Sequence, residues 1–138
     1  MNLLQDGSPE LSSVAELVSM HEDVSNLIDG MMKTMIENSG IGLAANQVGV
    51  LKRVIIVRSG GVFRAIINPE IIKRHPRQCK SIEGCLSFPG RKVTMMRSKT
   101  VSVKGYDADW APIRFNASGV DAFCVQHEID HLNGKTIA

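Results

Sequence analysis

The residues best suited to chemistry lie near the end of the chain, in Gln126-His127-Glu128-Ile129-Asp130-His131. On an α-helix, residues four apart share a face, so His127 and His131 can reach one metal ion. Glu128 lies about 100° further round the helix, close enough to touch a metal-bound water without being a ligand. The pattern indicates hydrolytic metal chemistry, although two histidines on the polar face of an ordinary amphipathic helix give the same letters.

A catalytic metal usually takes three protein ligands and leaves one position for water. The residues after His131 contain no Glu, Asp, His or Cys. The extended protease pattern H-E-x-x-H-x-x-G-x-x-H matches as far as Gly134 and fails at Ile137, where a histidine is needed. The third ligand is therefore expected upstream of the histidine pair.

Cys85 is the best upstream candidate, because Gly84 allows a close backbone approach and a thiolate binds divalent iron or zinc strongly. Cys79 lies in a polar, surface-like stretch. Cys124 lies three residues before His127, where it lines a pocket or packs as a small apolar residue. On spacing alone, a buried structural thiol fits Cys85 as well as a ligand does.

Length and composition limit the class of protein. A chain of 138 residues fits one domain spanning 1–138, and a hydrophobic content of 43% is typical of a soluble globular protein. The net charge of +2, the lack of a basic run and an aromatic content of 4% argue against nucleic-acid readout. No apolar stretch reaches the length of a membrane span, and three cysteines are too few for a disulfide framework. We therefore expect a cytoplasmic location and a monomer.

The periodicity predicts two helices around several strands. Apolar residues from Val24 to Ile36 recur at helical spacing, and Asn38-Ser39-Gly40 ends that helix. A second helix follows the capping-box-like Ser118-Gly119-Val120-Asp121. Residues 1–20 are weakly patterned and are expected to wrap the surface. Strands are expected at 53–57, 62–68, 71–72, 92–97, 100–106 and 110–115, with a turn at 59–61 and a break at Asn68-Pro69. This order of elements indicates an α+β fold.

Three segments together resemble the signature motifs of the peptide deformylase family. They are Gly40-Ile41-Gly42-Leu43-Ala44-Ala45-Asn46-Gln47, Glu83-Gly84-Cys85-Leu86-Ser87, and the histidine segment above. Each motif alone is weak or moderate, but the set in this order is highly specific. The resemblance runs from about Leu27 to Lys135 and implies short antiparallel or mixed sheets around a central metal-binding helix.

The resemblance implies a role for each matching residue. Cys85, His127 and His131 match the metal ligands, and Glu128 matches the general acid and base. Gln47 and the backbone N–H of Leu86 match the donors that stabilise the oxyanion. The family removes the formyl group from N-formylmethionyl peptides, usually with Fe(II), and tolerates Ni(II), Co(II) or Zn(II). A metal that lowers the pKa of water to ~7 and a preorganised amide donor suit a poor electrophile such as a formamide.

The resemblance also points to residues around the reacting groups. The methionine side chain needs an apolar slot, and the glycine-rich segment can offer a strand edge to the peptide backbone. The residues matched to this substrate site are Ile41, Gly42, Val120, Phe123 and Cys124. Asp130, Gln126 and Arg97 are expected to orient the site, with Asp130 pairing with Arg97. A solvated helix face explains Asp130 and Gln126 almost as well.

Two rival functions share parts of this pattern. A metalloprotease would use the same two histidines as metal ligands and the same glutamate as a base, but that function gives no role to Gln47 or Cys85. A non-catalytic binding module would be expected to lose Glu128 or Gln47, and both are present. Bacterial members of the family generally continue into a C-terminal helix implicated in docking at the ribosome, whereas this chain stops at Ala138. Ribosome docking is therefore in doubt, and the short form fits a virus, an organelle or a truncated chain.

Overall fold

The computed structural model describes residues 1–137, and Ala138, the last residue of the predicted domain, lies outside the described residues. The two α-helices are α1 (Ser25–Glu37) and α2 (Val120–Leu132), and short 3₁₀ turns occupy Pro9–Ser12 and Ala45–Val48. The strands are β1 (Gly42–Ala44), β2 (Val54–Ser59), β3 (Val62–Arg74), β4 (Gln78–Cys85), β5 (Phe88–Ser98), β6 (Thr100–Tyr106) and β7 (Pro112–Ser118).

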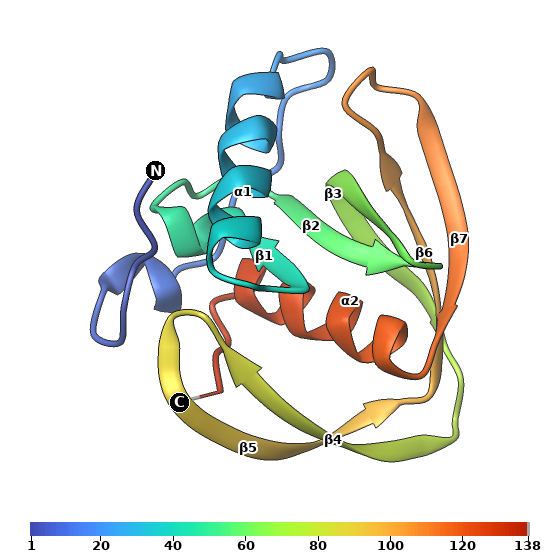
Figure 1. Cartoon of the computed structure of the whole chain (residues 1–138). Helices are drawn as coiled ribbons and strands as arrows, with labels where there is room; N and C mark the ends of the chain where they lie inside the picture. The colour runs from blue at the N-terminus through green and yellow to red at the C-terminus, as the bar shows by residue number, and fades with distance from the viewer. Residues whose placement is uncertain (138) are drawn as a thin grey trace.

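All the strand pairs between these elements are antiparallel. Five strands form one sheet in the order β1-β2-β3-β6-β7, and β4 and β5 form a separate two-stranded ribbon. Helix α2 runs between the five-stranded sheet and the ribbon, while α1 lies on the far side of β1 and β2 (Figure 1). This arrangement confirms the predicted α+β class. Among residues 1–137, no helix is long and apolar enough to cross a membrane.

Strand β2 is buried on both faces, which explains its unbroken β-branched run. Ile55 and Val57 belong to the core that includes α2, whereas Val54 and Ile56 belong to the core that includes α1. Successive side chains of a strand point to opposite faces, so one short strand joins two cores. Because β2 is held from both sides, it gives α2 a fixed base.

The first helix and most strands lie where the sequence predicts them, but the predicted break at Asn68-Pro69 is wrong. Strand β3 continues through this point with a register shift between Ile67 and Glu70 against β6. Asn68 has a φ of 52°, in the left-handed region that asparagine tolerates better than most residues. The pair therefore bends the strand as a bulge rather than ending it.

The capping box expected before the second helix is also absent. Helix α2 begins after Gly119, and no side chain caps it. The Ser118 hydroxyl lies 3.0 Å from Thr100 Oγ1, and Asp121 accepts a hydrogen bond from the Gly60 N–H at 3.1 Å. Ser118 therefore links the paired strands β6 and β7, and Asp121 fastens the turn after β2 to the start of α2.

The N-terminal segment enters the core instead of only wrapping the surface. Leu11, Ala15 and Val18 are buried, and the Ala15 N–H donates to the Leu132 carbonyl at 2.8 Å. The Arg53 guanidinium donates to the same Leu132 carbonyl at 3.2 Å. These bonds satisfy a backbone carbonyl at the end of α2. They secure the helix that carries the two histidines.

Truncating a core side chain beneath α2 should destabilise the whole fold. Ile55 is 0% exposed, so Ile55→Ala should lower the free energy of unfolding by ~2–5 kcal/mol. Ile36→Ala, at a position 57% exposed, should change it much less. Urea unfolding followed by circular dichroism measures both variants. Equal losses would contradict the assignment of Ile55 to the central core.

Candidate metal centre

Helix α2 presents His127 and His131 to the same point in space. Their Nε2 atoms are 3.2 Å apart and their ring centroids are 4.9 Å apart. One turn of helix separates the two residues, so both rings leave the same face. The opposite face of α2, with Ala122, Val125 and Ile129, packs into the core.

Strand β4 brings a sulfur atom to this pair. Cys85 is the last residue of β4, and its Sγ lies 3.3 Å from His131 Nε2. The Cys85 sulfur and a nitrogen of each histidine all lie within 4.8 Å of one another. Cys124, in contrast, contacts the Ile41 carbonyl at 3.3 Å, and Cys79 faces Arg97 in the β4–β5 register.

These three atoms have the spacing and chemistry of a metal-ligand set. Ligands roughly 2.0–2.3 Å from an ion at tetrahedral angles are roughly 3.3–3.5 Å from one another. The measured 3.2 and 3.3 Å separations are close to that spacing. A thiolate with two imidazoles suits Zn²⁺ or Fe²⁺, whereas it does not suit Mg²⁺ or Ca²⁺. The residues present therefore fit a single divalent transition-metal ion.

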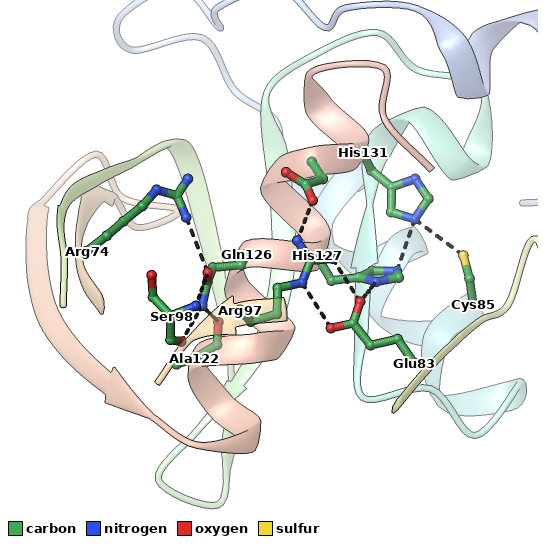
Figure 2. A network of polar contacts seen from close by, with 10 residues as sticks. Arg74, Glu83, Cys85, Arg97, Ser98, Ala122, Gln126, His127 and His131 are labelled. Atoms are coloured by element: carbon green, nitrogen blue, oxygen red, sulfur yellow. Dashed lines mark hydrogen bonds and ion pairs between the residues drawn. The ribbon is translucent and has the colours of Figure 1, made fainter. Parts of the chain in front are cut away.

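Glu83 is a further residue of this centre, and its contacts were not predicted from the sequence. Its Oε1 lies 2.9 Å from His127 Nδ1 (Figure 2). Its two carboxylate oxygens accept hydrogen bonds from the Arg97 guanidinium at 2.8 and 3.0 Å. Arg97 Nη1 also lies 2.5 Å from Asp130 Oδ2, so the expected pair is present. Glu83 lies two positions before Cys85, but no strand was predicted over these residues, so the side on which its carboxylate lies could not be predicted.

The same contacts set the charges of the centre. Burial opposes ionisation of Glu83, but hydrogen bonds from His127 and Arg97 outweigh it and lower the pKa of Glu83 to about 2. Burial also opposes protonation of His127, yet hydrogen bonds with Cys85 and Glu83 raise the pKa of His127 to about 10. Burial, together with the charge of His127, lowers the pKa of His131 to about 3. Metal binding requires the neutral ring, so Nε2 of His127 must first lose its proton. The Glu83 carboxylate then keeps the remaining proton on Nδ1 and leaves Nε2 for a ligand.

Glu128 lies beside the centre with a free oxygen. It is buried, and no residue among 1–137 hydrogen-bonds its Oε1. Burial raises the pKa of Glu128 to about 7. A carboxyl group with a pKa near neutrality can both accept and return a proton.

Gln47 faces the centre from a different element. It lies in the 3₁₀ turn after β1, where its Oε1 accepts the Ala44 N–H at 3.0 Å. That bond leaves Nε2 to donate, and Nε2 lies 3.4 Å from Cys85 Sγ and 3.2 Å from Ser87 Oγ. Leu86 lies in the turn between β4 and β5, next to Cys85.

Gln126, which was expected to help orient the site, bonds to groups outside the three candidate ligands. Its amide contacts the backbone of Ser98 and the Ala122 carbonyl, and its Oε1 accepts from Arg74 at 3.2 Å. Figure 2 shows these contacts on the side of Arg97 away from Cys85. Within the described residues, the Gln126 side chain makes no hydrogen bond to Cys85, His127 or His131. Gln126 therefore fastens the end of β5 to α2 without touching the centre.

A cavity of about 820 Å³ opens onto Cys85, His127 and Glu128. All the residues predicted to bind substrate line it, namely Ile41, Gly42, Val120, Phe123 and Cys124. A Cβ at Gly42 would lie 2.5 Å from Glu128 Oε2 and 2.7 Å from Cys124 Sγ. Glycine at position 42 therefore allows β1 to approach the reacting groups.

Comparison with known families gives one consistent result. The family model for polypeptide deformylase matches residues 1–138. Peptide deformylase 1 of Pseudomonas syringae pv. tomato is 43% identical over 98% of this chain and 83% of its own length. Peptide deformylase of Halothermothrix orenii is 44% identical over 93% of this chain and 84% of its own length.

Solved structures show the same similarity in three dimensions. The crystal structure of PDF from the Vibrio parahaemolyticus bacteriophage VP16T, in complex with actinonin, has a TM-score of 0.97 at 50% identity. That match covers 99% of this chain and 100% of the phage chain. Peptide deformylase from Thermotoga maritima has a TM-score of 0.94 at 37% identity, covering 99% of this chain and 93% of that one.

Removing the charge of Glu83 should weaken metal binding. Glu83→Gln keeps the shape of the side chain but loses the carboxylate that holds His127 and Arg97, so zinc affinity should fall ~10–100-fold. Competition with a chromophoric chelator measures this affinity. Glu70→Gln is a matched control, because Glu70 is exposed and its one ion pair among residues 1–137 is with Lys104. Unchanged affinity in Glu83→Gln would show that the His127 contact is dispensable.

Proposed function

We propose a residue-level mechanism for this chain, which belongs to the peptide deformylase family and removes the N-formyl group from nascent peptides. The observation that carries the mechanism is the convergence of Cys85, His127 and His131 beside Glu128 and Gln47. The whole set comes from one chain, so we propose that the protein acts as a single catalytic domain and as a monomer. We place it in the compartment where formylated nascent chains are made.

The family is metal-dependent, and we assign the ion to Cys85, His127 and His131. Fe(II) is the proposed native metal, with Zn(II), Ni(II) or Co(II) as substitutes, because a thiolate and two imidazoles suit all four. When bound, the ion supplies Lewis acidity and lowers the pKa of water to ~7. Glu83 supports this set by fixing the ring of His127, and Arg97 with Asp130 fixes Glu83.

Glu128 is the proposed proton carrier. Its free Oε1 and its pKa of about 7 allow it to take the proton of the attacking water. The amine of the product is a poor leaving group unless it is protonated, and the same Oε1 can return the proton to it. General acid and base catalysis of this kind contributes ~10²–10⁴ in rate.

Gln47 is the proposed donor to the negative oxygen that develops on the formyl group. The Ala44 N–H fixes Oε1 of Gln47, so Nε2 is already turned toward Cys85 before substrate arrives. Preorganised donors of this type are worth ~10²–10³ in turnover. The Leu86 N–H is proposed as a second donor because of its position next to Cys85.

The apolar part of the cavity is the proposed slot for the methionine side chain. Ile41, Val120, Phe123 and Cys124 line it close to Glu128. Strands β1 and β4 stand at the ends of their sheets, and residues from both line the cavity. Each offers an edge to which an extended peptide can add. A metalloprotease would leave Gln47 and Cys85 without a role, so we do not favour it.

Replacing the proton carrier should separate catalysis from metal binding. Glu128→Gln keeps the side-chain shape but cannot shuttle a proton, so the rate of formate release should fall at least ~10²-fold. Metal content per chain, measured by atomic spectroscopy, should stay close to that of the wild type. Loss of metal in parallel with activity would make Glu128 a ligand and contradict its assigned role.

The choice of metal should determine stability in air. Iron next to the Cys85 thiolate exposes that sulfur to oxidation. The iron form should therefore lose activity in air, while the zinc and nickel forms keep theirs. Formate release from a formyl-Met peptide, with mass analysis of the Cys85 peptide, measures both effects.

Removal of the metal should abolish activity in every form. The test is dialysis against a chelator, followed by restoration of the same ion. Full activity in the metal-free protein would contradict the mechanism as a whole. Air-stable activity of the iron form would contradict only the statement about oxidation of Cys85.

A further inference from the structure

One exposed charge stands at the rim of the catalytic cavity. The lysine, histidine and carboxylate side chains that line this cavity are Lys80, His127, Glu83 and Glu128. Glu83 and Glu128 are buried and His127 is half-buried at the centre, whereas Lys80 is exposed. Lys80 has no side-chain hydrogen bond or ion pair within residues 1–137, so its charge is free at the mouth of the cavity. The mechanism above gives it no role.

The neighbours of Lys80 leave its charge uncompensated. Met96 on β5 lies directly opposite Lys80. The next two residues of β4, Ser81 and Ile82, lie opposite Met95 and Thr94 of β5. None of these five residues is acidic. The nearest carboxylate along β4 is Glu83, which is already held by Arg97 and His127.

The position of Lys80 along β4 fixes which part of a substrate it can meet. Cys85 ends the strand at the metal centre, and at the usual rise Lys80 lies about 16 Å before it. An extended peptide along the same edge advances about 3.3 Å per residue. With its formyl group near Cys85 and its methionine opposite Gly84, its fifth residue comes opposite Lys80. Long side chains also reach diagonal neighbours two residues along the facing strand, so the third and fifth residues, whose side chains share the face of Lys80, are within range.

We propose that Lys80 selects formylated peptides that carry an acidic side chain at the third or fifth residue. The proposal rests on the proposed placement of the substrate along β4. A flexible ammonium group on an exposed strand attracts a carboxylate without demanding one fixed geometry. The preference is therefore graded, with acidic peptides processed fastest, neutral peptides next and basic peptides slowest.

The test compares three peptides, formyl-Met-Ala followed by three residues of Glu, Gln or Lys and a final Ala. For the wild-type protein, kcat/KM should fall about two- to fivefold at each step from Glu to Gln to Lys at low salt. The differences in kcat/KM among the three peptides should become smaller at 1 M salt, where the screening length is about 3 Å. The readout is formate release with the metal-loaded protein.

Two substitutions at Lys80 and one control make the test specific. Lys80→Gln should remove the order, and Lys80→Glu should reverse it. Lys99→Glu makes the same change in net charge at an exposed residue outside the cavity, so it should keep the wild-type order. Thermal unfolding should give similar Tm values for all variants, since Lys80 and Lys99 are both exposed.

The results separate this inference from the proposed function. Equal kcat/KM for the three peptides in the wild type, or an unchanged order in Lys80→Glu, would overturn the role of Lys80 and leave the deformylase mechanism standing. A reversed order in Lys99→Glu would also overturn it, because net charge alone would then explain the preference. No formate from any of the three peptides would instead overturn the proposed function.

Discussion

The Arg97 guanidinium, held between Glu83 and Asp130, joins the two parts of the molecule that supply the proposed metal ligands. Glu83 lies on β4 and Asp130 on α2, and Arg97 lies on β5. Cys85 reaches the histidines only if the β4–β5 ribbon stays fixed against α2. Breaking a buried ion pair by removing one partner typically costs ~3–5 kcal/mol, so this cluster strongly resists separation of the ribbon from the helix.

The cluster also explains how charged groups can be buried so close together. Glu83 carries a negative charge between two donors, Arg97 and His127 Nδ1. The buried charge of Glu83 is therefore hydrogen-bonded to a cation and to an imidazole N–H, and the buried charge of Arg97 is hydrogen-bonded to two carboxylates. Glu128 is the exception, because its Oε1 has no partner in the described residues and burial raises its pKa to about 7. The group without a partner is the one proposed to exchange protons with the substrate.

Much of the site could be predicted from sequence because its chemistry is local. Helical spacing places His127 and His131 on one face, and the predicted strand at 100–106 matches β6. Strand β4 could not be predicted in the same way. Its buried positions include Ser81 and Glu83, which face the site instead of an apolar core, so the usual alternation of polar and apolar residues is missing.

Long-range contacts account for the other differences. Gln126 sits beside the histidine pair in sequence, but its amide is taken by Ser98 and Ala122. Asn68-Pro69 reads as a break, yet pairing with β6 continues beyond it. In both cases a partner distant in sequence determines the outcome, and local spacing carries no information about that partner.

X-ray absorption of the zinc-loaded protein reports which atoms surround the ion. We expect one sulfur at ~2.3 Å and two imidazole nitrogens at ~2.0–2.1 Å, with the remaining position filled by a light atom. The sulfur contribution should disappear in Cys85→Ser. A wild-type spectrum with only nitrogen and oxygen neighbours would contradict the assignment of Cys85, and with it the role of the β4–β5 ribbon in building the centre.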